Sequence, residues 1–516
     1  MALAHPWPGD RAGRARAVAS AVRPLAPEVH RALVAQQAPL AASPARAAQL
    51  DLLRAGAAAV VTGQQVGLFL GPLYTIYKAA SAIALARRLA DETGAPVVPV
   101  FWLQTEDHDL AEIASVGLPG ATVEVPVDAD NRVSIAHRVL PAELGDRLAR
   151  LRERLGGGVL AAAHVERLAR HYRPGASWHA AFAGVLAELF APEGLVIVDP
   201  RDPALADAAA PIHERAIAEA GPIAAALTAR CAELERAGRP VQIHVRPGAP
   251  LAFYHPDGAE GPRLRLEPDG AGGFVEVGTG RSHARAALIA LARREPRRFS
   301  TSALLRPILQ DALLPTVANV GGPAEVAYFA QLGPLYAAFA MPMPMIVPRA
   351  KFRVTDHRTR TLLARLGLGP GDVAGDEAEL LARLRPPARP AEAIRDQLLR
   401  GFLAEHAALG EAVATPQLRK ALARTRGTVE HAVGVLAAKL ERAEVYADGE
   451  RVDAVRRLRA LLVPDGAPQE RRLGLAGLAA RIGDRALIDQ LMQHLAAAEL
   501  FGAASPLGGP VQDLAA

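Results

Sequence analysis

Cysteine is nearly absent from this sequence, since Cys231 is the single one among 516 residues. One thiol excludes an intramolecular disulfide and is typical of a protein kept in the reducing cytoplasm. Cys231 lies within residues 227–234, where apolar residues recur at helical spacing and no histidine is adjacent. We therefore interpret it as a packed thiol rather than a nucleophile, and we predict a cytoplasmic protein.

Lysine and aromatic residues are scarce as well. Lysine occurs only at positions 78, 351, 420 and 439, and aromatic residues make up 4% of the chain. The net charge of +5 is a weak excess for this length. So few aromatic side chains cannot form a surface on which bases stack. The composition therefore predicts no nucleic-acid partner.

Long unbroken hydrophobic segments are also missing. The uncharged stretch 326–348 is interrupted by Gly333, Pro334 and Pro342, which favour a helix followed by a strand over a membrane span. No apolar segment follows the arginines near the N-terminus, so we expect no signal peptide and no membrane partner. Because 50% of the residues are hydrophobic, the chain can bury a large core, and its length predicts more than one domain.

Residues 57–94 have the pattern of a strand, a glycine loop and a helix. An apolar run at 57–61 precedes a loop spaced by three glycines, and Pro72 suits the first turn of a helix that ends before Gly94. Residues 97–103 then indicate a second buried strand, so the order predicts a βαβ unit and a parallel sheet. Such a loop can direct backbone N–H groups at an anion, and a tight turn without a ligand fits the spacing equally well.

Acidic residues and a histidine follow the second strand, at the strand end where open α/β sheets bind ligands. His108 lies among Glu106, Asp107 and Asp109 and could act as a general base or a metal ligand. Asp109 followed by Glu112 also fits a helix cap. We predict His108, Asp107 and Asp109 as catalytic residues. A metal-dependent hydrolase centred on Glu106–Asp109 is a rival reading, but we predict no metal, because one imidazole is a poor ligand set for zinc.

A second strand, glycine and helix pattern occupies residues 299–353. The apolar run 316–320 is followed by two glycines and a proline, and residues 345–348 indicate the next strand. Arg306 and Asn319 are polar residues beside these apolar strands. Either they bind a ligand or they satisfy backbone groups near the turn.

The remaining segments suggest insertions and a helical tail. Residues 195–198 indicate a strand of the core, whereas 241–245, 251–254 and 263–266 resemble short antiparallel strands. We predict a core domain over 1–385, with insertions at about 120–190 and 205–295 that wall the cleft, and a helical domain over 386–516 after a proline-rich break.

The helical tail contains an apolar seam at the 4–3–4 spacing of a coiled coil, formed by Val429, Val433, Leu436 and Leu440. This seam could pair two subunits or close a helical hairpin within one chain. A non-catalytic scaffold that uses the tail for partners is a third class of function, although the polar strand ends argue against it.

Four stretches of the sequence resemble one family of enzymes. They are VVTGQQVGLFLGPLYTIYKA, which begins at Val60, PVFWLQTEDHD (99–109), LLRPILQDALLPTVANVGGPAE (304–325) and PDGAPQER (464–471). In this order they are similar to the bacillithiol biosynthesis cysteine-adding enzyme, the cysteine ligase of that pathway.

The resemblance implies a Rossmann-like parallel-sheet core of the class I synthetase type, with connecting-peptide insertions and a C-terminal coiled coil that forms a homodimer. It implies that L-cysteine is joined through an amide bond to the amine of glucosaminyl malate, in the last step towards a low-molecular-weight thiol. Together with Arg306 and the catalytic residues named above, the predicted site residues are Thr62, Gly63, Gln64, Gln65, Gly71, Tyr74, Lys78, Asn319, Gly321 and Gly322.

The reaction that this resemblance implies needs an activated carboxylate, so either ATP or another acyl donor must enter. The paired histidines of the class I synthetase signature are absent from residues 62–72, and no lysine-rich loop exists. The sequence leaves the use of ATP open. We hypothesise that Lys78 holds an anionic group, that His108 removes a proton from the attacking amine, and that both converge with Asn319 in one cleft.

Overall fold

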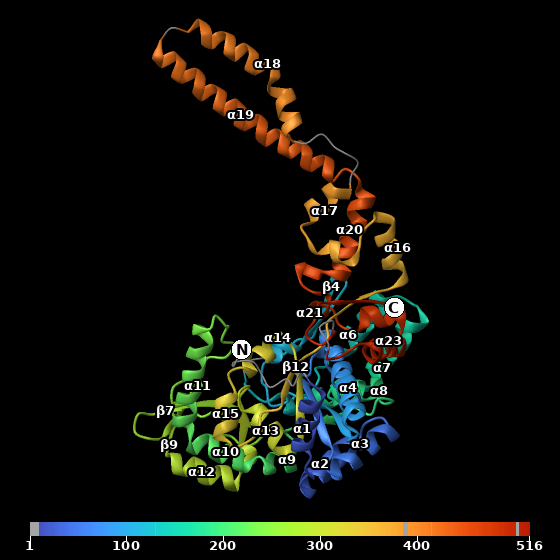
Figure 1. The fold of residues 1–516 in the computed structure, drawn as a ribbon, viewed down its shortest axis with the longest axis vertical. Coiled ribbons are helices and arrows are strands. Elements are labelled where there is room, and N and C mark those ends of the chain that lie inside the picture. Colours follow the sequence, from blue (N-terminus) through green and yellow to red (C-terminus); the bar gives the residue numbers. More distant parts are fainter. Residues whose placement is uncertain (1–9, 129–130, 385–390, 414, 502–504) are drawn as a thin grey trace. The chain divides into compact units, whose positions relative to one another are not determined.

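The computed structural model describes residues 10–128, 131–384, 391–413, 415–501 and 505–516. The chain divides into two compact units. The first contains the residues up to Asp356 together with Gln469–Ala516, and the second contains His357–Pro468. We describe each unit by itself (Figure 1).

The first unit is built on a five-stranded sheet in which every neighbouring pair of strands is parallel. The strands stand in the order β12-β11-β1-β2-β5, which is the doubly wound order with the first strand at the centre. Their bounds are β1 Ala58–Gln64, β2 Val97–Leu103, β5 Val196–Val198, β11 Thr316–Gly321 and β12 Met345–Pro348. In the sheet register, Val61 is paired with Val100 on one side and with Asn319 on the other. The apolar runs recognised in the sequence are therefore the central strands.

Helices cover both faces of this sheet. Alternate residues of β1 and β2, such as Val61 and Val100, share an apolar cluster with α2 Pro27–Gln37, α3 Pro44–Arg54 and α13 Arg306–Leu313. The long helix α4, Tyr74–Thr93, contacts β1, β2 and β11 and covers the other face. Strands buried on both faces explain why the sequence shows continuous apolar runs rather than alternation.

Two long segments leave the sheet and return to it. The segment between β2 and β5 contains α5 Leu110–Ile113, β3 Ser115–Leu118, β4 Ala121–Glu124, η2 Ile135–His137, α6 Leu144–Leu155, α7 Val159–His171 and α8 Trp178–Leu189. The segment between β5 and β11 contains α9 Pro203–Ala208, α10 Ala210–Ala218, α11 Ala220–Arg236, β6 Ala252–Tyr254, β7 Leu264–Pro268, β8 Phe274–Glu276, β9 Ser282–His283, α12 Arg285–Arg294, η3 Pro296–Arg298, β10 Phe299–Thr301 and α13. The strands of this second segment form an antiparallel sheet in the order β10-β6-β7-β8-β9.

The C-terminal residues return to the first unit, so the predicted helical domain over 386–516 is wrong at its end. Its start differs as well, because the second unit begins at His357 and the predicted core over 1–385 therefore runs into it. Here β14 Gln512–Ala515 pairs with β13 Phe352–Thr355, and α23 Asp484–Ala497 packs on α4. The remaining elements of this unit are α1 Arg11–Ala21, η1 Leu68–Leu70, α14 Pro323–Phe329, α15 Gly333–Ala338, α21 Gln469–Arg472 and α22 Ala476–Ile482. Burial of apolar surface against α4 explains the return, and the helical pattern along the sequence does not reveal it.

Two smaller predictions also need correction. Helix α4 begins at Tyr74, and Pro72 instead forms a β-bridge with Gly474 of the returning segment. Residues 241–245 form no strand, because the side chain of Gln331 accepts hydrogen bonds from Gln242 N and Ile243 N, both at 3.2 Å. This side chain satisfies backbone groups that a neighbouring strand would otherwise pair.

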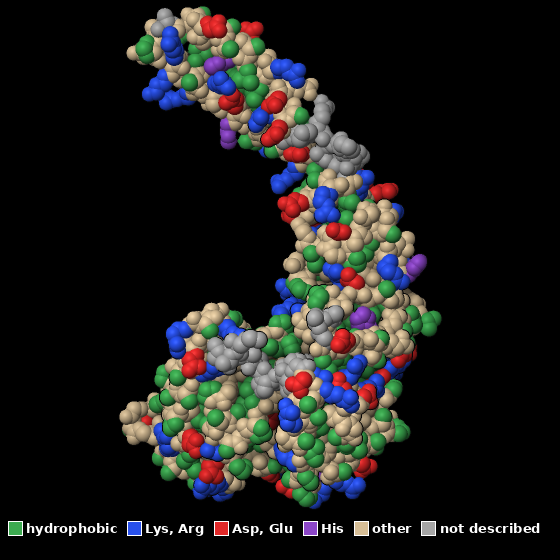
Figure 2. All heavy atoms as spheres, viewed as in Figure 1, with side chains coloured by type: hydrophobic (Ala, Val, Ile, Leu, Met, Phe, Trp, Pro, Cys, Tyr) green, Lys and Arg blue, Asp and Glu red, His purple; other side chains and the backbone are tan. Residues whose placement is uncertain are grey.

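The second unit is helical. It contains α16 His357–Leu366, η4 Pro370–Ala374, α17 Glu377–Leu384, α18 Ala391–Ala412, α19 Pro416–Val445, α20 Gly449–Leu462 and η5 Pro464–Gly466. Helices α18 and α19 pack against each other as a hairpin that buries Leu399 and Ala437. The outer surface of this hairpin carries hydrophobic side chains among charged ones (Figure 2). Across the described part of the chain, no helix combines the length and the apolar character needed to cross a membrane.

Candidate functional site

A cavity of about 570 Å³ lies at the carboxyl ends of the parallel strands. Residues that follow each of the five strands line it, as expected for a ligand site of an open α/β sheet. Side chains from the segment between β5 and β11, and Arg471 of α21, complete its wall. The lining residues that matter below are Gln64, Gln65, Tyr74, Lys78, Glu106, Asp107, His108, Phe253, Arg263, Thr301, Arg306, Gly322, Glu325, Tyr328, Arg349 and Arg471.

Lys78 lines the cavity but is only 2% exposed. Its ammonium donates to Gly63 O and to Gln64 Oε1, both at 2.8 Å, and forms an ion pair with Glu325. These three contacts match the three N–H groups of a lysine. Burial lowers the pKa of Lys78, and the charge of Glu325 opposes this shift. Lys78 therefore ties the end of β1 to α14, and the expectation that it holds an anionic ligand directly does not fit this geometry.

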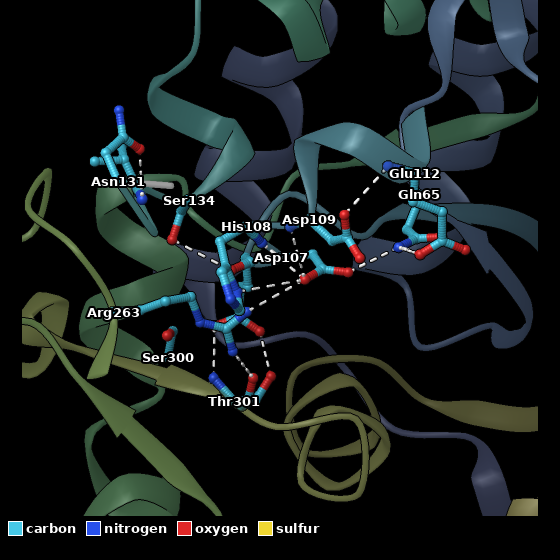
Figure 3. Close-up of polar contacts among 12 residues, drawn as sticks. Gln65, Asp107, His108, Asp109, Glu112, Asn131, Ser134, Arg263, Ser300 and Thr301 are labelled. Atoms are coloured by element: carbon cyan, nitrogen blue, oxygen red, sulfur yellow. Dashed lines mark hydrogen bonds and ion pairs between the residues drawn. The ribbon is translucent and has the colours of Figure 1, made fainter. Parts of the chain in front are cut away.

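The loop after β2 is organised around the carboxylate of Asp107 (Figure 3). Asp107 accepts hydrogen bonds from Gln65 Nε2 at 2.8 Å and from the amide of His108 at 2.7 Å, and it lies 3.7 Å from Arg263 Nη1. Burial acts to raise the pKa of Asp107, but the charge of Arg263 and these hydrogen bonds outweigh it and lower the pKa. Asp107 is therefore an ionised anchor of the loop.

His108 projects from this loop into the cavity wall. Its Nδ1 lies 3.7 Å from Asp107 Oδ1, beyond hydrogen-bond distance, and is buried without a partner among the described residues. Burial and the nearby charge of Arg263 lower the pKa of His108, while Asp107 opposes the shift. A pKa below the ordinary value of 6.5 leaves the imidazole neutral at pH 7, and a neutral imidazole can accept a proton.

Asp109 does not share this environment. It is exposed, caps α5 by accepting a hydrogen bond from Glu112 N at 3.1 Å, and is absent from the cavity lining (Figure 3). The structure shows the helix cap that the sequence offered as an alternative, and this position does not support the catalytic role predicted for Asp109.

Glu106 connects the loop after β2 to the antiparallel sheet. Its buried carboxylate accepts hydrogen bonds from the amide of Thr301, at 3.0 Å, and from the Thr301 hydroxyl. Arg263 donates to Thr301 O at 2.7 Å, and its guanidinium stacks 3.8 Å from the centre of the Phe253 ring. Of these residues, Phe253 and Arg263 belong to the predicted insertion at about 205–295, and both line the cavity. No group of three or more His, Cys, Asp or Glu within the described ranges is arranged to hold a metal ion.

Two further arginines, Arg306 and Arg349, line the cavity. Arg306 begins α13, donates to Tyr328 OH at 2.8 Å and lines the cavity, so a ligand could reach it. Arg349 follows β12 and donates two hydrogen bonds to Glu470, at 2.8 and 2.7 Å. Arg349 is 3% exposed, and its Nε is buried without a partner among the described residues. A Cβ built on Gly322 would lie 3.8 Å from that nitrogen.

Several predicted site residues lie outside the cavity and have roles in the backbone fold instead. Thr62 donates from its hydroxyl to Val320 O at 2.8 Å, which links β1 to β11. Gly63 presses on Trp102 O, which a Cβ would approach to 2.8 Å, and Gly71 turns the chain at a φ of 63°. Asn319 is buried within β11, and neither it nor Gly321 lines the cavity, so convergence holds for Lys78 and His108 but not for Asn319. Gln64, Gln65, Tyr74 and Gly322 do line it.

Sequence reasoning missed Glu325, Arg349, Tyr328, Arg263 and Arg471 as lining residues. Glu325 and Arg471 end two of the stretches that carried the resemblance, and Tyr328 lies three residues beyond one of them. Their closeness to the stretches that carry the family resemblance could have marked these three residues as candidates for the site. Arg263 lies in the insertion and Arg349 forms its ion pair across 121 residues of sequence, so no local pattern points to either.

The strand order and the polar cavity at its carboxyl edge define a Rossmann-like α/β domain. Residues 14–350 match the family model described as "Bacillithiol biosynthesis BshC, N-terminal Rossmann-like domain". The chain belongs to this family, as its resemblance in sequence indicated.

Full-length relatives agree with the family match, and each of the following carries the name "Putative cysteine ligase BshC". A protein of Koribacter versatilis is 39% identical over 68% of this chain and 65% of its own length, so the match spans just under two thirds of that relative. A protein of Salinibacter ruber is 36% identical over 72% of this chain and 69% of its own. A protein of Solibacter usitatus is 33% identical over 90% of this chain and 87% of its own.

Proposed function

We propose that this protein is a ligase of bacillithiol biosynthesis that joins the carboxyl group of L-cysteine to the free amine of glucosaminyl malate through an amide bond. The observation that carries the proposal is a neutral histidine and a set of arginines in one cavity at the strand ends of a Rossmann-like domain. The names of the relatives support cysteine as one substrate, and the resemblance described under Sequence analysis supplies glucosaminyl malate as the other.

His108 is the general base of the proposed reaction. The amine nitrogen of the sugar attacks the activated carboxyl carbon of cysteine, a C–N bond forms, and the bond to the leaving group breaks. The nitrogen must lose a proton as it becomes an amide, and the neutral imidazole of His108, whose Nδ1 has no partner in the described part of the chain, can take it. Asp107, held by Gln65 and Arg263, fixes the loop that carries His108.

Anionic groups of the substrates bind to arginine rather than to Lys78 in this proposal. Arg349 Nε is a buried charged donor without a partner among the described residues, and Arg306 and Arg471 line the same cavity. Burying a charged donor away from water costs free energy unless a hydrogen-bond acceptor pairs with it. A ligand that supplies such an acceptor would therefore stabilise Arg349. These residues fit a carboxylate or a phosphate group, so an ATP-derived phosphate could be held here. Product formation with and without ATP, measured in the test below, distinguishes ATP from another acyl donor.

The C-terminal hairpin is proposed to hold two subunits together. Leu436 and Leu440 of the predicted seam are 48% and 42% exposed within one chain. The hairpin contact therefore leaves part of the seam available to a second copy.

The test is mass-spectrometric detection of the cysteinyl product from L-cysteine and glucosaminyl malate, with and without ATP. The His108→Ala variant should form product about 10²- to 10⁴-fold more slowly, while the exposed His357→Ala variant should match the wild type. Full activity of His108→Ala would remove His108 from the mechanism. Absence of product with the wild-type protein under every acyl-donor condition would refute the proposed function itself.

A further inference from the structure

Arg306 differs from other buried cations of the cavity at the strand ends, because no carboxylate among the described residues pairs with it. Three cations that line the cavity each have a carboxylate within ion-pair distance: Lys78 with Glu325, Arg263 with Asp107 and Arg349 with Glu470. Arg306 is 7% exposed, and its described partners are neutral. Its Nη1 donates to Gln310 Oε1 at 2.9 Å and its Nη2 to Tyr328 OH at 2.8 Å. A buried guanidinium without a paired anion is costly, so a bound anion would stabilise it.

Two carboxylates act on the charge of Arg306 without contacting it. Glu325 and Asp311 exert this influence, but neither forms an ion pair with Arg306 within the described part of the chain. Glu325 is paired with Lys78, and the carboxylate of Asp311 accepts hydrogen bonds from the Gln310 side chain, at 3.0 Å, and from the Tyr336 hydroxyl. They offset part of the charge of Arg306, but they leave its remaining N–H groups without an acceptor.

Tyr328 adds a second donor beside Arg306. Its hydroxyl oxygen accepts a hydrogen bond from Arg306, so the hydroxyl hydrogen must point elsewhere, and the described residues place no acceptor for it. Arg306 Nε also has no partner among those residues, and, unlike Arg349 Nε, it is not fully buried. Both side chains line the cavity. One guanidinium N–H and one O–H are therefore available to a ligand at adjacent positions.

Two donors and one positive charge match a carboxylate. Each of its two oxygens can accept one of the hydrogen bonds, and its single negative charge balances one guanidinium. A phosphate group would bring up to two negative charges and three acceptor oxygens, more than this pair of side chains can satisfy. The pair therefore favours a carboxylate over a phosphate.

We propose that Arg306 and Tyr328 bind a carboxylate of the malate part of glucosaminyl malate. This inference rests on the proposed function, in which the carboxyl group of cysteine becomes the amide. The carboxylates that keep their charge throughout that reaction belong to malate. One oxygen accepts from Arg306 Nε and the other from the Tyr328 hydroxyl, so these two residues select an amino sugar that carries an acidic aglycone. The assignment leaves Arg349 and Arg471 for other anionic groups.

The test compares glucosaminyl malate with methyl glucosaminide, which has the same amine but a methyl group in place of malate. Calorimetry with the full-length protein gives the two dissociation constants, and their ratio is the malate preference. The wild type should prefer glucosaminyl malate, and Tyr328→Phe should lower the preference about tenfold, since it removes a hydrogen bond to a charged group. The kcat with saturating substrates should stay nearly unchanged. Tyr446→Phe, at a half-buried tyrosine of the second unit, is the matched control and should keep the wild-type preference.

A second variant tests the charge without removing a buried group. Ala324 is exposed, lines the cavity and lies one helical turn before Tyr328 in α14. Ala324→Asp should lower the malate preference about threefold or more through like-charge repulsion, relative to the neutral Ala324→Asn. An aspartate is favourable in the first turn of a helix, so this variant should fold even if Tyr328→Phe does not.

Three results would overturn the proposal. A wild type that binds both sugars equally has no malate subsite. A malate preference that stays at the wild-type value in Tyr328→Phe and in Ala324→Asp would place the carboxylate elsewhere. A higher KM for L-cysteine in Tyr328→Phe, with the malate preference unchanged, would assign the pair to the other substrate. Product formation by the wild type tests the proposed function separately, because the binding measurements need no turnover.

Discussion

The internal ion pair of Lys78 makes a sharp prediction about stability. Replacing Lys78 by methionine removes the cation from a site that is 2% exposed and leaves the Glu325 carboxylate, 17% exposed, without its charged partner. Removing one member of a buried pair costs about 3–5 kcal/mol. Glu325 keeps the hydrogen bond from Gly322 N at 2.8 Å, so we expect the low end, about 3 kcal/mol. Lys78→Met should therefore lower the urea concentration at the midpoint of unfolding.

The measurement is urea unfolding followed by the fluorescence of Trp102 and Trp178, which are both fully buried in the first unit. The double variant Lys78→Met/Glu325→Gln removes both charges and should recover at least about 1 kcal/mol of the loss. Lys439→Met, on the exposed surface of α19, is the matched control and should stay within about 0.5 kcal/mol of the wild type. Wild-type stability of Lys78→Met, combined with weaker binding of glucosaminyl malate, would show that Lys78 is a ligand-binding residue and that the structural assignment is wrong.

Four further predictions concern pH, assembly and metal content. The kcat/KM of the ligase reaction should rise with pH through an apparent pKa below 6.5, since the lowered pKa of His108 leaves this base protonated only at acid pH. The His108→Gln variant should lack this step in its pH profile. A wild-type kcat/KM that does not change from pH 5 to 7 would contradict the prediction. Burial lowers the pKa of His213 and His255 to about 3, so the unfolded state binds more protons than the folded state between pH 3 and 6.5. As the pH falls from 6.5 towards 3, each histidine should lower the free energy of unfolding by about 1.4 kcal/mol per pH unit. Urea unfolding measured at a series of acid pH values checks this. The double variant Leu436→Asp/Leu440→Asp should be monomeric by light scattering, because a paired seam would bury two charges, and a persistent dimer would refute the seam. Elemental analysis of protein purified without added metal should find no stoichiometric zinc, and a full equivalent would revive the hydrolase reading.

Local patterns were sufficient for the strands of the core and for several turns. The apolar runs at 97–103 and 345–348 are the strands β2 and β12 with the predicted bounds. The glycine and proline after β11 begin α14 as expected, and Asp109 caps a helix as its spacing with Glu112 allowed. These features depend on neighbours within a few residues, so the sequence displays them directly.

Assignments of function to single residues were less reliable, because a polar residue near a strand end has several possible uses. Thr62 and Asn319 stand on central strands: Thr62 donates to Val320 O, and Asn319 is buried away from the cavity lining. Lys78 lies at the cavity as predicted, but its ammonium is already paired with Gly63 O, Gln64 Oε1 and the carboxylate of Glu325. Which partners a side chain finds is decided by packing, and a single sequence does not contain that information.

The sequence by itself determined the parallel sheet, the strand ends that carry the polar residues, and, through long unusual motifs, the family. Tertiary structure alone decided which charged and polar groups meet. Arg349 pairs with Glu470 across 121 residues, and Glu106 binds Thr301 across 195 residues. It also decided that Gln469–Ala516 returns to the first unit. The physical reason is range: propensities and turns are set by adjacent residues, whereas burial and ion pairing depend on segments that only the folded chain brings together.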